Sequence, residues 1–208
     1  MSAEPNVIIH KVRIPAANDM LAVADEPLDT TSKRPSCWLV GAHGGAGVTT
    51  LATTLAPLGD AGQIIPAAND PATVVLVCAN HMEGLVRAHR AIGQFGSDHA
   101  GGADLLGLVI VDTAPPLKDR RLRKQLADRR GVLEAAAPQT WHVPYIPEWQ
   151  ATRTSQLPVW TPRARGSESD QKKKKKNVSA VESVPDEVAT IGHTIHSAAV
   201  DLYRELHS

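Results

Sequence analysis

The segment CWLVGAHGGAGVTTLATT, residues 37–54, governs how this sequence of 208 residues is interpreted. Its first residues are mostly apolar and suit a buried strand. A glycine-rich loop follows, and the stretch VTTLATTLAPLGDAG predicts a helix that Pro57 and Gly59 close. A strand, a glycine loop and a helix in this order turn backbone N–H groups and a helix N-terminus toward one point. Such an arrangement suits the binding of an anion.

Strands and helices are expected to alternate beyond this segment. Apolar runs and helical spacing predict strands at residues 73–79, 105–111 and 140–146, and helices at residues 85–95 and 118–130. Pro144 interrupts the last strand and Pro147 closes it. Alternation of this kind predicts an α/β fold of the three-layer type, with a mainly parallel sheet and a ligand crevice at the carboxyl ends of the strands.

Changes in composition divide the chain into four regions. Residues 1–35 form a flexible arm whose apolar patch Val7–Ile9 suits an edge strand, and residues 36–150 form the α/β domain. Residues 151–186 are rich in Ser, Pro and basic residues, with five consecutive lysines, and predict a disordered linker. Residues 187–208 predict an amphipathic helix. Its apolar positions are Val188, Ile191, Ile195, Ala199, Leu202 and Leu206.

The net charge and the cysteine content narrow the classes of protein to which the chain can belong. The formal net charge is zero, so no global field attracts the protein to nucleic acid or to an anionic membrane. Cys37 and Cys78 both stand in apolar surroundings outside any metal-ligand spacing, and we expect buried, reduced thiols. No basic leader and no apolar run long enough to span a membrane is present, which favours a cytoplasmic protein.

The glycine loop resembles the deviant Walker A motif of MinD/ParA-type ATPases, a resemblance that implies a P-loop-type domain. That motif has lysine, two glycines, any residue, glycine, lysine and two Ser/Thr residues. The pattern is kept at Gly44, Gly45, Gly47, Thr49 and Thr50. His43 stands at the position of the signature lysine, and Val48 at the position of the phosphate-binding lysine. Because valine supplies no positive charge, the usual stabilisation of the transition state would be lost.

The resemblance implies a nucleotide site, with ATP or another nucleotide bound together with magnesium. The implied phosphate-binding residues are His43, Gly44, Gly45, Ala46, Gly47, Val48, Thr49 and Thr50. Thr49 would hold magnesium together with Asp112, which follows the strand at residues 105–111 in a turn similar to the Asp-Thr-Pro-Pro turn of this superfamily. The plain alternatives are a tight glycine turn and a turn-initiating aspartate.

Residues 38–149 also resemble uncharacterised MinD-like proteins of actinobacterial conjugative and other mobile elements. The matching pieces are WLVGAHGGAGVTTLA, VVLVCAN, LLGLVIVDTAPPL and WHVPYIPEW. This resemblance implies a setting, a mobile element, and not a reaction. Because His43 and Val48 replace both lysines of the motif, we interpret the chain as a non-catalytic binding or regulatory module, a pseudo-NTPase, in that setting. A magnesium-dependent ATPase with weak activity is an alternative, so the sequence leaves catalysis open.

Further alternatives concern partners. The helix at residues 118–130 is rich in Arg and Lys, and a DNA-associated adaptor would use Arg120, Arg121, Arg123 and Lys124 to contact phosphates. A solvated basic face is the plain alternative. The amphipathic C-terminal helix needs a cover, which its own domain, a protein partner, a second copy of the chain or a membrane surface would supply.

Overall fold

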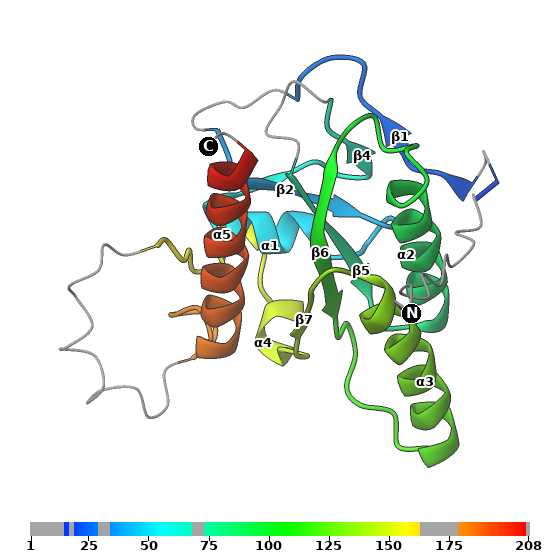
Figure 1. Ribbon diagram of the computed structural model, residues 1–208. Helices are drawn as coiled ribbons and strands as arrows, with labels where there is room; N and C mark the ends of the chain where they lie inside the picture. Colours follow the sequence, from blue (N-terminus) through cyan, green and yellow to red (C-terminus); the bar gives the residue numbers. More distant parts are fainter. Residues whose placement is uncertain (1–14, 17–18, 29–33, 68–72, 163–178, 207–208) are drawn as a thin grey trace, which may run out of the picture.

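Five parallel strands form the central sheet of the protein, in the order β3-β2-β5-β6-β7 (Figure 1). The strands are β2 (Cys37–Gly41), β3 (Leu58–Asp60), β5 (Thr73–Ala79), β6 (Asp104–Val111) and β7 (Thr140–Val143). The structure is a computed structural model, and it describes residues 15–16, 19–28, 34–67, 73–162 and 179–206. The predicted α/β class with a mainly parallel sheet is confirmed.

The sheet is buried on both faces because its central strands are almost wholly apolar beyond their first residues. All residues of β5 are buried, and successive side chains point to opposite faces. Val75 and Val77 belong to one hydrophobic cluster, whereas Leu76 and Cys78 belong to a second. Burial raises the pKa of both Cys37 and Cys78 to about 12, so these thiols are buried as predicted.

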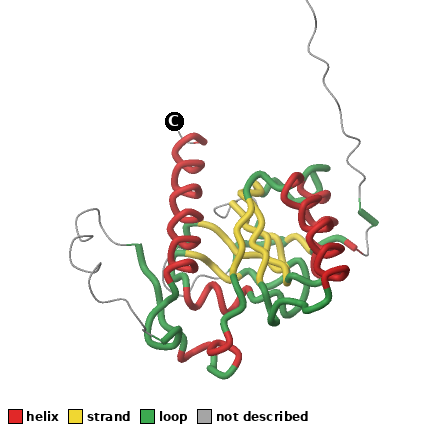
Figure 2. Tube along the Cα trace, turned by 90° about the horizontal axis from the view of Figure 1, so that it is seen from below, coloured by secondary structure: helices red, strands yellow, loops and turns green. Residues whose placement is uncertain are grey.

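Helices cover the two faces of the sheet (Figure 2). On one face lie α1 (Val48–Thr54) and α5 (Asp186–Leu206). On the other lie α2 (Met82–Phe95) and α3 (Arg120–Ala136). A right-handed crossover places its helix on opposite faces when the chain moves in opposite directions along a parallel sheet, which explains why α1 and α2 are separated.

The C-terminal helix packs on its own domain. Val188, Ile191, Ile195 and Ala199 are all buried in the cluster that contains α1. A Cβ atom added at Gly192 would lie 2.6 Å from Leu55 Cδ2, so α5 approaches the domain closely at this point. The apolar stripe predicted from the sequence therefore covers the sheet.

Parts of the predicted linker, residues 151–186, make defined contacts. Leu157 is buried, and Trp160 forms a parallel β-bridge with Leu55. The indole N–H of Trp149 donates a hydrogen bond to the carbonyl oxygen of Ala180 across 3.0 Å. Residues 163–178, which include the five lysines, lie outside the described residues. The short helix α4 (Pro147–Gln150) precedes this region, and the 3-10 helix η2 (Thr154–Gln156) lies within it.

Two boundaries differ from the sequence-based expectation. The helix predicted to extend to about Pro57 ends at Thr54, and residues 58–60 form β3 instead. Gly59 lets β3 pair with β2, because any larger residue would place a Cβ atom 2.4 Å from the ring of Trp38 on β2. The fourth predicted strand ends at Val143, since Pro144 lacks the N–H that would continue the ladder.

A second, two-stranded sheet lies at the N-terminal side of the domain. In it β1 (Ala22–Val23) pairs in parallel with β4 (Ile64–Ile65), which the sequence did not predict. The expected edge strand at Val7–Ile9 falls outside the described residues. Among the described helices, none combines the length and the apolar character needed to cross a membrane.

Candidate functional site

The carboxyl ends of the parallel strands gather the candidate residues at one edge of the sheet. The chain leaves β2 toward β3 on one side, whereas β5 pairs with β2 on the other side, and the helices that follow β2 and β5 cover opposite faces. The strand order therefore switches between β2 and β5. Crevices for ligands form at such switch points, beyond the carboxyl ends of the strands.

The glycine loop occupies this position, and two of its glycines have a positive φ angle. Gly45 and Gly47 have φ angles of 76° and 98°, values that residues with a side chain rarely adopt. The backbone N–H groups of Gly47, Val48, Thr49 and Thr50 have no hydrogen-bond acceptor among the described residues. Four backbone donors in succession are thus available to an anion at the start of α1.

His43 is buried and ties the loop to β5. Its Nε2 atom accepts a hydrogen bond from the backbone N–H of Ala79 across 3.1 Å, and its Nδ1 atom lies 2.8 Å from the carbonyl oxygen of Gly44. An accepting Nε2 needs a lone pair, and a neighbouring carbonyl needs a proton on Nδ1, so both contacts are satisfied by the neutral ring. His43 thus fills the switch point between β2 and β5 as a structural link without positive charge.

Val48 is a core residue. Its side chain belongs to the cluster beneath α1 and is 7% exposed. A Cβ atom added at Gly41 would lie 3.1 Å from Val48 Cγ2, so the valine points back toward the end of β2. The position of the expected lysine therefore contributes packing in place of charge.

Thr49 and Asp112 both lie at the same edge. Thr49 is exposed and Thr50 is partly exposed. The Asn80 side-chain amide donates a hydrogen bond to Asp112 Oδ1 across 2.5 Å, and the backbone N–H of Asp112 donates to the carbonyl oxygen of Val143. A Cβ atom at Gly47 would lie 3.8 Å from the side chain of Val111, which brings the loop beside the strand that carries Asp112.

Asn80 and His81 were not singled out from the sequence. Asn80 follows β5 as Asp112 follows β6, and its Oδ1 atom is buried without a hydrogen-bond partner among the described residues. His81 caps α2 by accepting a hydrogen bond from the backbone N–H of Gly84, and its ring centroid lies 5.3 Å from that of His43. Their place directly after a buried parallel strand was the signal that could have identified them.

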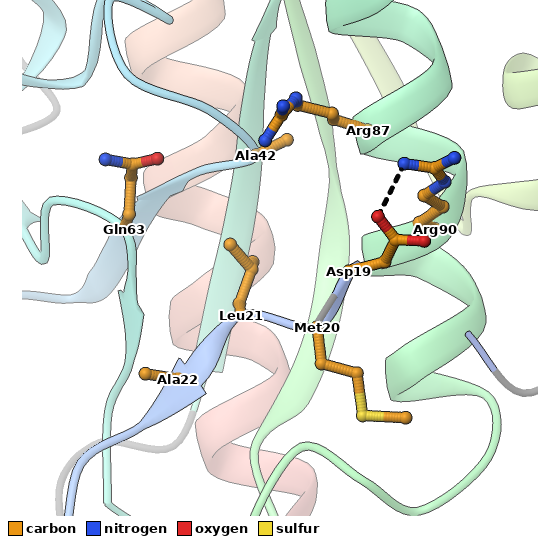
Figure 3. Close-up of a pocket in the computed structure, with 8 residues that line it drawn as sticks. All are labelled: Asp19, Met20, Leu21, Ala22, Ala42, Gln63, Arg87 and Arg90. Atoms are coloured by element: carbon orange, nitrogen blue, oxygen red, sulfur yellow. Dashed lines mark hydrogen bonds and ion pairs between the residues drawn. The ribbon is translucent and has the colours of Figure 1, made fainter. Parts of the chain in front are cut away.

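A pocket of about 220 Å³ lies next to the glycine loop, on the α2 side of the sheet (Figure 3). Arg87 and Arg90 from α2, Gln63 and Ala42 contribute to its lining. Arg90 pairs with Asp19 across 2.8 Å, and Arg87 pairs with Glu83 across the same distance. Because carboxylates already neutralise both arginines, this pocket offers little net charge to an anion.

The basic residues expected to contact DNA lie at the start of α3, which follows the carboxyl end of β6. Arg120, Arg121, Arg123 and Lys124 are all exposed on the first turns of α3. None of them forms an ion pair with any residue that the structure describes.

Fold and site together define an α/β protein with a glycine loop at the carboxyl edge of a parallel sheet. Residues 35–164 match the model of a family of unknown function (DUF6668), and the chain belongs to this family. The match covers the five strands of the large sheet and ends before α5. Searches of curated proteins and of solved structures gave no match.

Proposed function

We propose that the glycine loop binds the phosphate group of a nucleotide without hydrolysing it, so that the chain acts as a non-catalytic binding or regulatory module. The observation that carries this proposal is the series of four backbone N–H groups from Gly47 to Thr50, which lie at the carboxyl edge of the sheet and have no acceptor in the described part of the chain. Backbone donors and the helix dipole attract an anion regardless of which side chains the loop carries.

Hydrolysis is left out of the proposal because the loop contains no cation. Val48 packs into the core and the hydrogen bonds of His43 suit its neutral form. Stabilising the charge that develops on a transferring phosphoryl group requires positive groups or a metal ion placed against it. The residues of this loop fit a phosphate group as a ligand more closely than as a reactant.

Magnesium fits the residues at one point. Mg²⁺ usually takes one or two carboxylates from the protein and completes its shell with phosphate oxygens and water. Asp112 has one carboxylate oxygen engaged by Asn80, and Thr49 has an exposed hydroxyl group. These two residues would hold the ion beside a bound phosphate, and the ion would then neutralise phosphate charge. A role in the transfer or maintenance of a mobile element rests on the sequence resemblance alone.

The test is calorimetric titration of the full chain with ATP, ADP and GTP, with and without magnesium. Gly45 offers a matched pair of variants, because a Cβ atom there would meet no atom within 4 Å and Asn and Asp both tolerate a positive φ. Gly45→Asp adds a negative charge beside the proposed anion, whereas Gly45→Asn adds nearly the same volume without charge.

We expect the wild type and Gly45→Asn to bind nucleotide. Gly45→Asp should lose about tenfold or more in affinity, because the added negative charge repels the phosphate. No variant should release phosphate. Absence of heat with the wild type at millimolar nucleotide, or equal affinity of the Asp and Asn variants, would contradict the proposal. Phosphate release that Asp112→Ala abolishes would favour the alternative of an ATPase.

A further inference from the structure

The first turns of α3 project beyond the body of the protein. Every residue from Arg120 to Gln125 is exposed, and Leu122 has 49% of its surface exposed although it is a large apolar residue. Figure 1 shows this end of α3 extending past the ends of β6 and β7. We call residues 120–125 the projecting segment of α3.

The rest of α3 holds the helix to the body. Leu133 is fully buried in the cluster beneath α2, and Leu126 packs against that cluster. Arg129 Nη2 lies 3.0 Å from His89 Nδ1 on α2, within hydrogen-bonding distance. Successive helical residues turn by about 100°, so these three side chains share one side of the helix.

The four basic side chains of the projecting segment point away from the body. They are Arg120, Arg121, Arg123 and Lys124. At about 100° per residue they occupy an arc of about 160°, centred opposite the side that carries Leu126 and Leu133. No acidic side chain among the described residues forms an ion pair with any of them. The projecting segment therefore presents four positive charges and no negative one, in a chain whose formal net charge is zero.

We propose that the projecting segment of α3 binds duplex nucleic acid through its phosphates. A helix with its side chains is about 10–12 Å across, which matches the width of the B-DNA major groove, about 12 Å, but only a helix free of its own domain on several sides can enter a groove. The outward arc carries charge and no aromatic or large aliphatic side chain, whereas protein interfaces centre on such anchors. Phosphate contacts need only the charge. The proposal is independent of nucleotide binding at the glycine loop.

Two double variants of equal net charge test the proposal. Arg120→Ala with Lys124→Ala removes two adjacent charges of the outward arc. Arg153→Ala with Arg204→Ala removes two exposed charges elsewhere. Both variants keep Lys172 to Lys176, which lie outside the described residues, so any contribution of these lysines is the same in both. All replaced side chains are exposed, so we expect unchanged circular dichroism and melting temperature.

The measurement is fluorescence anisotropy of a labelled 30-base-pair duplex of mixed sequence, titrated with the full chain at several salt concentrations from about 50 mM upward, the range in which phosphate contacts weaken measurably. For the wild type we expect affinity that falls steeply with salt. Each phosphate contact adds about 0.9 to the slope of log affinity against log salt, so the α3 variant should lose about 1.8 from the slope. The control variant should keep the wild-type slope.

Three outcomes would overturn the proposal. The first is no binding of duplex by the wild type at low salt and high protein concentration. The second is an equal loss of slope in both double variants, which would mean that total charge alone decides. The third is equal or tighter binding of a labelled polyglutamate peptide that depends on Arg120 and Lys124, because the projecting segment would then suit an acidic protein.

Discussion

The helices α2 and α3 cover the same face of the sheet, but they differ in how much of their length is buried. The 14 residues of α2 bury Leu85, Ala88, Ala91 and Ile92 against the sheet. The 17 residues of α3 fully bury only Leu133. Both helices connect neighbouring parallel strands, so topology alone would give them the same task. The helix α3 is therefore longer than a crossover between neighbouring strands requires. Packing against the body does not explain the sequence of its first turns.

The same comparison extends to the helix starts. At the start of α2, Gly84 lies so close to the loop that a Cβ atom would be 2.4 Å from the carbonyl oxygen of Ala79 and 2.8 Å from His43 Nε2. In α3, a Cβ atom at Gly131 would meet no atom within 4 Å. Close packing thus links α2 to the glycine loop, whereas α3 keeps open space around much of its length.

The largest expected effect separates the two ends of α3. Leu133→Ala should lower the free energy of unfolding by about 2–5 kcal/mol, because it leaves a cavity beneath the helix. Leu122→Ala should change it by less than about 0.5 kcal/mol, because the side chain is half exposed. Urea denaturation followed by circular dichroism measures both. Similar losses in the two variants would mean that the projecting segment is packed against something.

A second pair of variants should have opposite signs. Gly84→Ala should cost about 1–3 kcal/mol of unfolding free energy, because the added methyl group meets backbone and the ring of His43. Gly131→Ala should add about 0.5–1 kcal/mol, because alanine is favoured over glycine in a helix interior where space is free. Melting temperatures of the two variants against the wild type provide the check. A stabilised Gly84→Ala would contradict the close contact between α2 and the loop.

The smallest expected effect on stability comes from the contact between His89 on α2 and Arg129 on α3, and it depends on pH. Burial, with the nearby charge of Arg129, lowers the pKa of His89. The unfolded chain then binds more protons than the folded one below about pH 6.5, so stability present above that pH is lost as pH falls through the folded pKa. His89→Gln should flatten this loss in urea titrations between about pH 7.5 and pH 5, the range in which histidine titrates. An unchanged pH dependence in that variant would assign the loss to other groups, such as His196, whose pKa burial also lowers.

Much of the α/β architecture could be predicted from local sequence. The run Thr73–Ala79 is expected as a strand and is one with the same bounds, because the six apolar residues that follow Thr73 suit a strand buried on both faces. The apolar spacing of Leu85, Ala88 and Ile92 likewise gave the buried face of α2. For the candidate site, the sequence determined which residues the glycine loop contains and that neither lysine of the motif is present.

Only the tertiary structure decided what those residues do. The edge strand β3 depends on pairing with β2, and the bridge of Trp160 depends on Leu55, which is distant in the chain. The role of His43 depends on the N–H group of Ala79, 36 residues further along the chain. The sequence by itself determined the local elements, because spacing and turn residues act over a few positions. Packing partners, and with them the projection of α3, follow from where the elements meet in space.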